Sequence, residues 1–185
     1  MSWRSYLSLT KPRVVVLLQI TALCAVLVHD RMEEQVGMDT AYTMLIVFVG
    51  GYLSAGGANA INMWYDRDID PMMTRTEGRP IPSGEVSSES ALALGVLLSI
   101  SGVSWFWILS NEIAAFWSAF SILFYVFIYS IWLKRSTPQN IVIGGIAGST
   151  PPVIAWSAAE DGLAMSTKSA NLMLDSLVDI GSPLP

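Results

Sequence analysis

The sequence has little of the chemistry that soluble proteins use most: one cysteine, Cys24, one histidine, His29, and charged residues at only 14% of 185 positions. A single cysteine forms no intramolecular disulfide and no cysteine-based metal cage. Acidic residues (15) outnumber basic ones (10), so the positive surface of a nucleic-acid-binding protein is missing. Hydrophobic residues reach 52% and the mean hydropathy is +0.50. This composition excludes an ordinary soluble domain and indicates a protein embedded in lipid.

Five uncharged stretches are close to the length that a helix needs to cross the hydrocarbon core of a bilayer, about 20 residues. Basic residues precede the first stretch as in a signal peptide, but no small-residue cleavage site follows, so we interpret it as the first membrane span. The sequence therefore predicts an all-α, polytopic membrane helical bundle with about five transmembrane helices. The predicted spans are Val14–Val28, extendable toward Tyr6, Ala41–Tyr65, Ser90–Ser110, Ile113–Leu133 and Ile141–Ala159.

Lysine and arginine are unevenly distributed among the segments that join these spans. Eight of the ten lie on one predicted side of the membrane, and two, Arg31 and Lys168, lie on the other. Because positively charged loops stay on the cytoplasmic side, we expect a multi-pass protein of the cytoplasmic membrane whose N-terminus and Asp-rich loop face the cytoplasm. The eight are Arg4, Lys11, Arg13, Arg67, Arg75, Arg79, Lys134 and Arg135.

Two of the predicted spans carry glycines that let helices approach closely in lipid, where packing drives association. The fifth span also contains Pro151 and Pro152, which remove two backbone donors and predict a kink or a break in that helix. The glycines are Gly50, Gly51, Gly56 and Gly57 in the second span and Gly144, Gly145 and Gly148 in the fifth.

An acidic motif follows the second span. Asn62, Asp66 and Asp70 are spaced by four residues and share one face if the helix continues into the loop, with Asp68 beside them. Carboxylates this close repel one another unless a cation lies among them, and oxygen ligands suit Mg2+, which completes its shell with water and substrate phosphate. We therefore predict a magnesium and diphosphate site with Asn62, Asp66, Asp68 and Asp70 as ligands, of which Asn62, Asp66 and Asp70 are the candidate catalytic residues.

Two arginines of the same loop, Arg75 and Arg79, are also four residues apart and could bind the phosphate oxygens that the metal leaves free. The alternative is a solvated loop whose acids and arginines only pair with one another. The amides of Asn59 and Asn62 argue against it, because polar groups at membrane depth usually face a cavity or a functional site. An EF-hand does not fit, because Pro71 occupies the position where that loop needs glycine.

The sequence resembles the UbiA superfamily of intramembrane prenyltransferases and, within it, the family of protoheme IX farnesyltransferases, or heme O synthases. The likeness covers roughly Tyr6 to Trp156, and the acidic motif alone would indicate only the superfamily. Three blocks carry it: Leu-Thr-Lys-Pro-Arg-Val at 9–14, Asn62-x3-Asp66-Arg-Asp-Ile-Asp70 continuing through Arg79-Pro-x-Pro-Ser-Gly84, and Leu-Lys-Arg-Ser-Thr-Pro-Gln-Asn at 133–140 leading to Pro151-Pro152.

The resemblance implies a bundle of nine spans with a cavity open to the cytoplasm and Mg2+ as cofactor. It also implies transfer of a farnesyl group from farnesyl diphosphate to the 2-vinyl group of heme B, which gives heme O. Tyr125, Tyr129 and the tryptophans are candidates for shielding the allylic cation. The residues that would bind the diphosphate are Arg75, Arg79, Lys134, Arg135 and Lys11.

The chain departs from the family pattern after Ala159, where nothing resembles the family's second acidic loop. We therefore expect residues 1–159 to be the N-terminal part of a UbiA-type membrane domain, truncated from nine spans, and residues 160–185 to be an atypical tail, either frayed or partly helical. Two alternatives stay open: a non-catalytic membrane fragment that associates with other helices, and a prenyltransferase acting on an aromatic quinone precursor. His29, on the predicted outer side, is expected to be an interfacial residue rather than a heme ligand.

Overall fold

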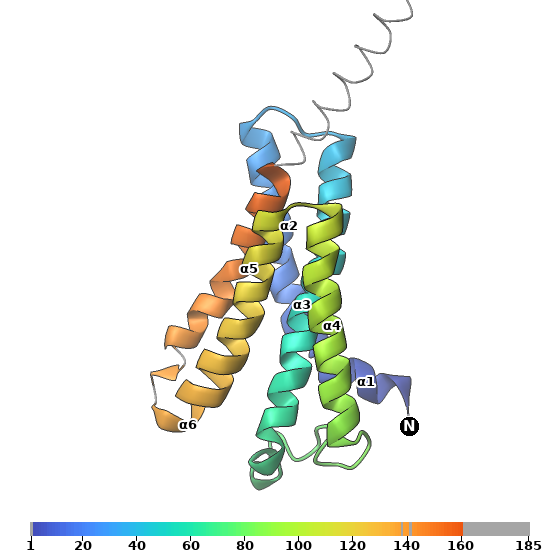
Figure 1. Cartoon of the computed structure of the whole chain (residues 1–185), viewed down its shortest axis with the longest axis vertical. Helices are drawn as coiled ribbons and strands as arrows, with labels where there is room; N and C mark the ends of the chain where they lie inside the picture. The colour runs from blue at the N-terminus through green and yellow to red at the C-terminus, as the bar shows by residue number, and fades with distance from the viewer. Residues whose placement is uncertain (1, 138, 141, 161–185) are drawn as a thin grey trace, which may run out of the picture.

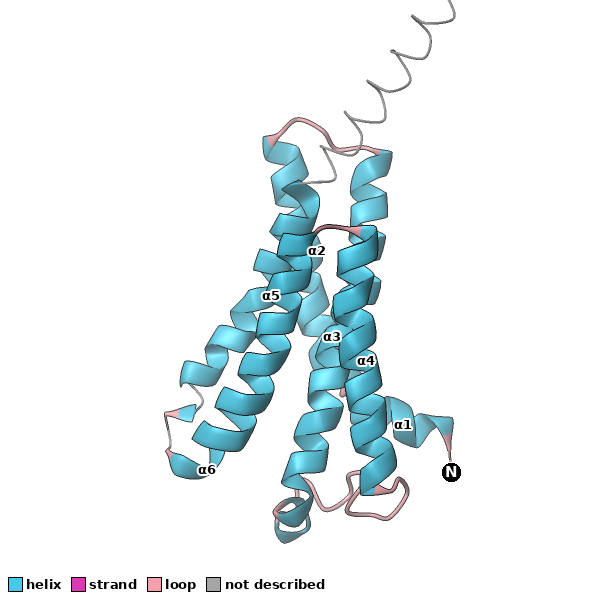
Figure 2. Cartoon of the chain, in the orientation of Figure 1, coloured by secondary structure: helices cyan, strands magenta, loops and turns pink. Residues whose placement is uncertain are grey.

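The structure, a computed structural model, describes residues 2–137, 139–140 and 142–160, and the regular elements of this part of the chain are all helices (Figure 1, Figure 2). Four of these helices are long and apolar enough to span a membrane, which confirms the all-α membrane bundle. The predicted tail lies outside the described residues, apart from Glu160. In chain order the first four helices are α1 (Trp3–Leu9), α2 (Pro12–Met32), α3 (Met38–Tyr65) and α4 (Ser88–Leu109). A continuous helix follows, made of α5 (Glu112–Leu123), the π-helical η3 (Phe124–Leu133) and α6 (Lys134–Ser136). A last helix covers residues 142–160.

The fifth predicted span is helical over residues 142–160, but it is not among the four that are apolar enough by composition. The break predicted at its two prolines is not observed, because the helix runs through both positions. Pro151 leaves the carbonyl of Ala147 without its usual amide donor. The hydroxyl of Thr150 donates to that carbonyl at 2.8 Å, so the polar group is satisfied within the helix.

The chain turns sharply between α1 and α2, so the predicted extension of the first span toward Tyr6 is wrong. Lys11 has a φ of 51°, in the left-handed region that residues other than glycine rarely adopt. Pro12 then begins α2, where its missing N–H costs nothing. Leu9 is fully buried and packs with Ala60 of α3. This turn places Lys11 beside the end of α3.

Small residues hold α3 and α4 in close contact. A Cβ placed on Gly57 would lie 2.6 Å from the backbone nitrogen of Ser99, and one placed on Gly102 would lie 2.7 Å from that of Ser54. Such distances leave room for glycine alone, as expected for helices that pack in lipid. An added Cβ would also meet neighbours, as predicted, at Gly50, Gly51, Gly56 and Gly144. At Gly145 or Gly148 it would have no described residue within 4 Å.

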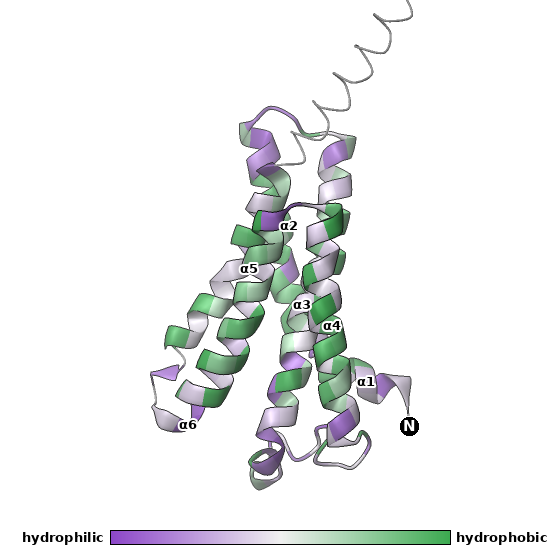
Figure 3. Cartoon of the chain, in the orientation of Figure 1, coloured by the Kyte–Doolittle hydropathy of each residue, from purple (hydrophilic) through white to green (hydrophobic). Residues whose placement is uncertain are grey.

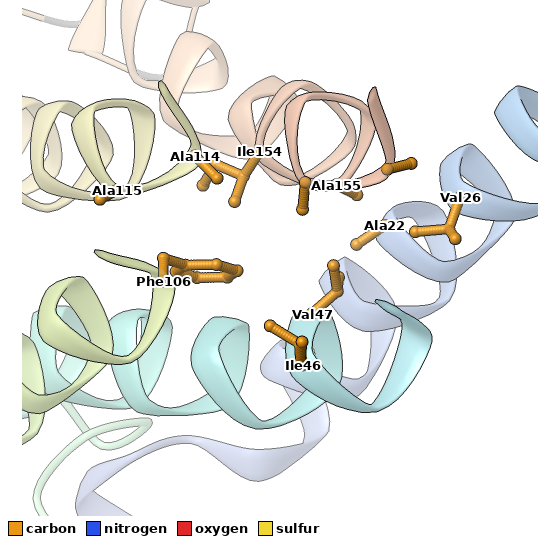
Figure 4. Packing of buried hydrophobic residues seen from close by; sticks show 11 residues of the cluster. Ala22, Val26, Ile46, Val47, Phe106, Ala114, Ala115, Ile154 and Ala155 are labelled. Atoms are coloured by element: carbon orange, nitrogen blue, oxygen red, sulfur yellow. The ribbon is translucent and has the colours of Figure 1, made fainter. Parts of the chain in front are cut away.

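The main apolar core lies at the end of the bundle where α3 begins, and the fully buried ring of Phe106 packs there near Val47, Ala114 and Ile154 (Figure 4). Toward the opposite end, η3 and the last helix diverge from α3 and α4 (Figure 1). Hydrophilic residues gather near the two ends of the bundle and apolar ones cover its middle (Figure 3). This distribution suits a bundle surrounded by lipid.

Candidate active site

The acidic motif lies where α3 ends. Asn62 belongs to the last turn of that helix, and the chain then continues through two short 3-10 turns that carry the aspartates. Asn62, Asp66 and Asp70 are only 2%, 0% and 0% exposed, so the three residues predicted to share a face are all buried. The two turns are η1 (Asp66–Asp68) and η2 (Asp70–Met72).

Asn62 connects three elements through its side-chain amide. Its Oδ1 accepts a hydrogen bond from Lys11 Nζ at 2.8 Å, which ties α3 to the α1–α2 turn. Its Nδ2 donates to Asp66 Oδ2 at 3.1 Å and to Ser130 Oγ at 3.0 Å in η3. Ser130 in turn donates to the carbonyl of Tyr125 at 2.9 Å. These bonds fix the orientation of the amide and hold Asp66 in place.

The π-helical stretch η3 contains Ser130 and is followed directly by Lys134, a second residue of the site. Its last residues lead directly into Lys134, whose backbone N–H donates to the carbonyl of Tyr129 five residues earlier, which is the spacing of a π-helix. Helices of this kind are rare and occur mostly at functional sites. The sequence prediction missed Ser130, although a single serine between Tyr129 and Ile131 in an otherwise aromatic and aliphatic run was a usable signal.

Two buried carboxylates each hold a basic side chain. Lys134 Nζ forms an ion pair with Asp66 Oδ2. Arg79 NH1 lies 2.7 Å from both carboxylate oxygens of Asp70. Both aspartate side chains are fully buried, whereas the side chains of Lys134 and Arg79 keep 23% and 20% of their surface exposed. The two cations therefore lie between the buried acids and the surrounding solvent or ligand.

Other predicted site residues lie nearer the surface. Arg135 donates to both oxygens of Asp68 at 2.7 and 2.9 Å, and the side chain of Asp68 is 57% exposed. Asp68 is thus turned toward Arg135, and its role as a metal ligand stays a prediction. Arg75 is exposed in the loop and makes no ion pair with any residue of the described part of the chain.

Lys11 lies within electrostatic reach of the whole buried cluster. Burial lowers the pKa of its ammonium group from the ordinary value to about 8, and the positive charges of Arg79 and Lys134 act in the same direction. Asp66 and Asp70 oppose this shift. Three cations therefore converge on two carboxylates, and an added anion would favour the charged form of Lys11.

Asp66 has one carboxylate oxygen to spare. Its Oδ2 accepts from Asn62 and Lys134, but its Oδ1 is buried and has no hydrogen-bond partner among the residues that the structure describes. Among residues 2–137, 139–140 and 142–160, no three His, Cys, Asp or Glu side chains are grouped closely enough to hold a metal ion. The donor set fits a cation bound in the manner of Mg2+, through one or two carboxylates with the remaining ligands from water and phosphate.

An apolar cavity of about 340 Å3 is lined by α2, α3, α4, α5, η3 and the last helix, and its lining reaches Asn59, one helical turn before Asn62. Its polar lining includes Asn59 and Tyr125, whose hydroxyl donates to Asn59 Oδ1 at 3.4 Å. Tyr125 and Tyr129 both line the cavity and stack with ring centroids 5.1 Å apart. Gly144 makes room for the Tyr129 ring. The tryptophans of the described residues do not contribute to this lining.

His29 lies at the end of α2 away from Lys11. Its Nδ1 is 2.9 Å from Asp30 Oδ1, and its ring meets Trp156 edge-on with centroids 4.9 Å apart. The side chain is 4% exposed and buried in the packing of that end. This position separates His29 from the acidic motif, as predicted.

Comparison with known proteins places these features in context. Residues 14–176 match the UbiA prenyltransferase family. Three similar proteins are named protoheme IX farnesyltransferase. That of Gluconobacter oxydans is 48% identical over 165 residues, which cover 89% of this chain and 50% of the relative. Those of Acidiphilium cryptum and Paracoccus denitrificans are 51% identical over 154 residues (83% of this chain, 47% of the relative) and 43% identical over 179 residues (96% of this chain, 55% of the relative). The chain spans about half the length of the curated relatives it matches. No solved structure matches the chain.

Proposed function

Because the chain belongs to the UbiA prenyltransferase family, we propose that it takes part in the transfer of a farnesyl group from farnesyl diphosphate to the 2-vinyl group of heme B, giving heme O. The relatives named protoheme IX farnesyltransferase support this choice of donor and acceptor. The part of the activity that the described residues would supply is the diphosphate site and one side of the prenyl cavity.

The observation that carries the proposal is the spare oxygen of Asp66. Lys134 pairs with the other oxygen of the same buried carboxylate, and Lys11 lies within electrostatic reach of it. The apolar cavity begins at Asn59, one helical turn before Asn62. An allylic diphosphate has a highly charged end and a long apolar chain, so it needs these two environments side by side. Diphosphate oxygens would compete with the carboxylates of Asp66 and Asp70 for the cations that they now hold.

The reaction needs negative charge to be stabilised on the leaving group. When the bond from C1 of the farnesyl group to oxygen breaks, the electron pair leaves with the diphosphate, and Lys11, Arg79 and Lys134 would neutralise it. A Mg2+ ion held by Asp66, with Asp70 and Asn62 beside it, would supply further positive charge there.

The other half of the reaction needs a cavity that water enters only sparingly. The allylic cation would lie among apolar residues, with the faces of Tyr125 and Tyr129 available for cation-π contact. The vinyl group of heme B donates its electron pair to C1. Water then adds to the resulting cation and loses a proton, which leaves the hydroxyl group of heme O.

A direct test uses the purified 185-residue chain with heme B, farnesyl diphosphate and Mg2+. Formation of heme O, detected by mass, would support the proposal. Prenylation of an aromatic quinone precursor in place of heme B would identify the other acceptor class. Binding of farnesyl diphosphate without any transfer would mean that this chain acts as a non-catalytic fragment.

Replacing Ser130 with Ala is expected to weaken Mg2+-dependent binding of farnesyl diphosphate about fivefold to tenfold, which corresponds to one lost hydrogen bond of about 1 kcal/mol. The Asn62 amide would lose its acceptor in η3 and hold Asp66 less firmly. Ser130→Thr, which keeps the hydroxyl, should restore most of the affinity. Ser99→Ala removes a buried hydroxyl that bonds within α4 instead, to the carbonyl of Gly95, and an equal loss in that variant would count against a specific role for Ser130.

We also propose that the Asp66 end of the bundle faces the cytoplasm, because eight of the ten basic residues belong to segments at that end. In a Cys24→Ser background, an impermeant maleimide should label Glu33→Cys in intact right-side-out vesicles and Ser83→Cys only after permeabilisation. Both positions are exposed and lie in segments at opposite ends of the bundle. The reverse labelling pattern would invert the proposed orientation.

A further inference from the structure

A basic groove lies on the outside of the turn between α1 and α2. It has a volume of about 400 Å3 and is open on one side. No acidic side chain contributes to its lining, which combines positive and apolar groups. The lining residues are Arg4, Leu7, Ser8, Lys11, Pro12, Arg13 and Val14.

Two of its three cations have no carboxylate partner. Lys11 is bonded to Asn62 and belongs to the candidate active site. Arg4 lies over the ring of Trp3 at 5.9 Å, and neither it nor Arg13 forms an ion pair within the described part of the chain. Elsewhere at this end of the bundle, Arg79, Lys134 and Arg135 each hold an aspartate. Arg4 and Arg13 are therefore available to an external anion.

An exposed apolar stripe starts at the groove and follows α2 toward the middle of the bundle. Its side chains follow Arg13 at spacings of four, three and seven residues and so lie on one face of the helix, with Arg13 at its end. Leu17, Ile20 and Leu27 on this face are 66%, 53% and 41% exposed. Trp3, 70% exposed, lies beside the groove, and tryptophan is enriched at the level of lipid headgroups.

We propose that this groove binds the phosphate of an anionic phospholipid, with an acyl chain lying along the Leu17–Ile20–Leu27 stripe. The arginines supply the charge that a phosphodiester requires, and the stripe supplies the apolar contact that a free phosphate would not use. The cavity face of α2 carries Leu18 and Ala22 instead, and Val14 contributes to both the groove and the cavity. Beyond Val14 the lipid would therefore occupy a different side of the helix from the farnesyl chain. The inference does not depend on the proposed enzymatic function.

The test measures bound lipid by native mass spectrometry after the chain is equilibrated with equimolar phosphatidylglycerol and phosphatidylcholine. The unmodified chain should retain phosphatidylglycerol preferentially. Arg4→Gln/Arg13→Gln should reduce this preference roughly tenfold or more, since each basic residue near an anionic headgroup contributes several-fold. Arg4→Lys/Arg13→Lys keeps the charges and should keep most of the preference.

The matched control is Arg31→Gln/Arg67→Gln, which removes the same charge from two exposed arginines outside the groove. It should leave the preference unchanged. An equal loss in this control, or an unchanged preference in Arg4→Gln/Arg13→Gln, would overturn the proposal. Displacement of phosphatidylglycerol by an equal concentration of inorganic phosphate would also overturn it, because the acyl chain would then contribute nothing.

Discussion

Asp66→Asn is expected to lower Mg2+-dependent binding of farnesyl diphosphate by at least about a hundredfold. The change removes the negative charge on the spare oxygen that fits a cation. Loss of an outer-shell partner typically costs about 10- to 100-fold in metal affinity, and loss of a ligand itself should cost at least the upper end of that range. Lys134 would remain beside a neutral amide. The measurement is a binding titration of labelled farnesyl diphosphate with the purified chain, with and without Mg2+.

The matched control is Asp68→Asn, the same substitution two residues further along the chain. Asp68 is exposed and paired with Arg135, and exposed pairs contribute only about 0–1 kcal/mol. We expect this variant to bind within about threefold of the unmodified chain. Helical content measured by circular dichroism should be equal in both variants. Equal loss of binding in the two would indicate that Asp68 is a ligand, as the sequence predicts, and that the burial of Asp66 does not set it apart.

Gly102→Leu is expected to have the largest effect on stability. The new side chain would be forced against the backbone of Ser54, which cannot move without separating α3 from α4. Overpacking of this kind typically costs about 1–3 kcal/mol and more where backbone is involved, so we expect a loss of at least about 3 kcal/mol. Denaturant-induced loss of helical signal in mixed micelles measures it.

Gly148→Leu provides the control for that substitution. It makes the same change of residue inside a helix, with the same gain in helix propensity, at a position where no residue of the described part of the chain lies within 4 Å of an added Cβ. Its stability should equal or slightly exceed that of the unmodified chain. If both variants lost stability equally, tight packing of α3 against α4 would not be the cause.

Features set by local sequence were predictable. The lengths and composition of the apolar stretches predicted four spans to within a few residues, because a helix in lipid must satisfy its backbone internally. The spacing of Asn62, Asp66 and Asp70 matches their common burial and the bond from Asn62 to Asp66, although α3 itself ends at Tyr65 and the chain continues through 3-10 turns. The prediction that the glycines allow close approach of neighbouring elements was correct at Gly50, Gly51, Gly56, Gly57 and Gly144. It did not apply at Gly145 and Gly148, where an added Cβ would meet none of the described residues.

Features set by distant partners were not predictable. Nothing near Asp68 in the sequence shows that Arg135 would hold it, since the two are 67 residues apart. The left-handed conformation of Lys11 depends on burial of the turn against α3, and so does its bond to Asn62. Thr150 compensates for Pro151 only within the finished helix. Each of these depends on tertiary contacts that a pattern of hydrophobicity does not encode.

The π-helical stretch makes segment length matter as much as residue type. An α-helix advances about 100° per residue, so deleting a single position from this stretch would turn everything that follows it by about that angle. Lys134 would then no longer point toward Asp66, although every aromatic residue important for membrane insertion could be retained. Insertions and deletions between Tyr125 and Leu133 are therefore expected to be tolerated less well than substitutions that leave the number of residues unchanged.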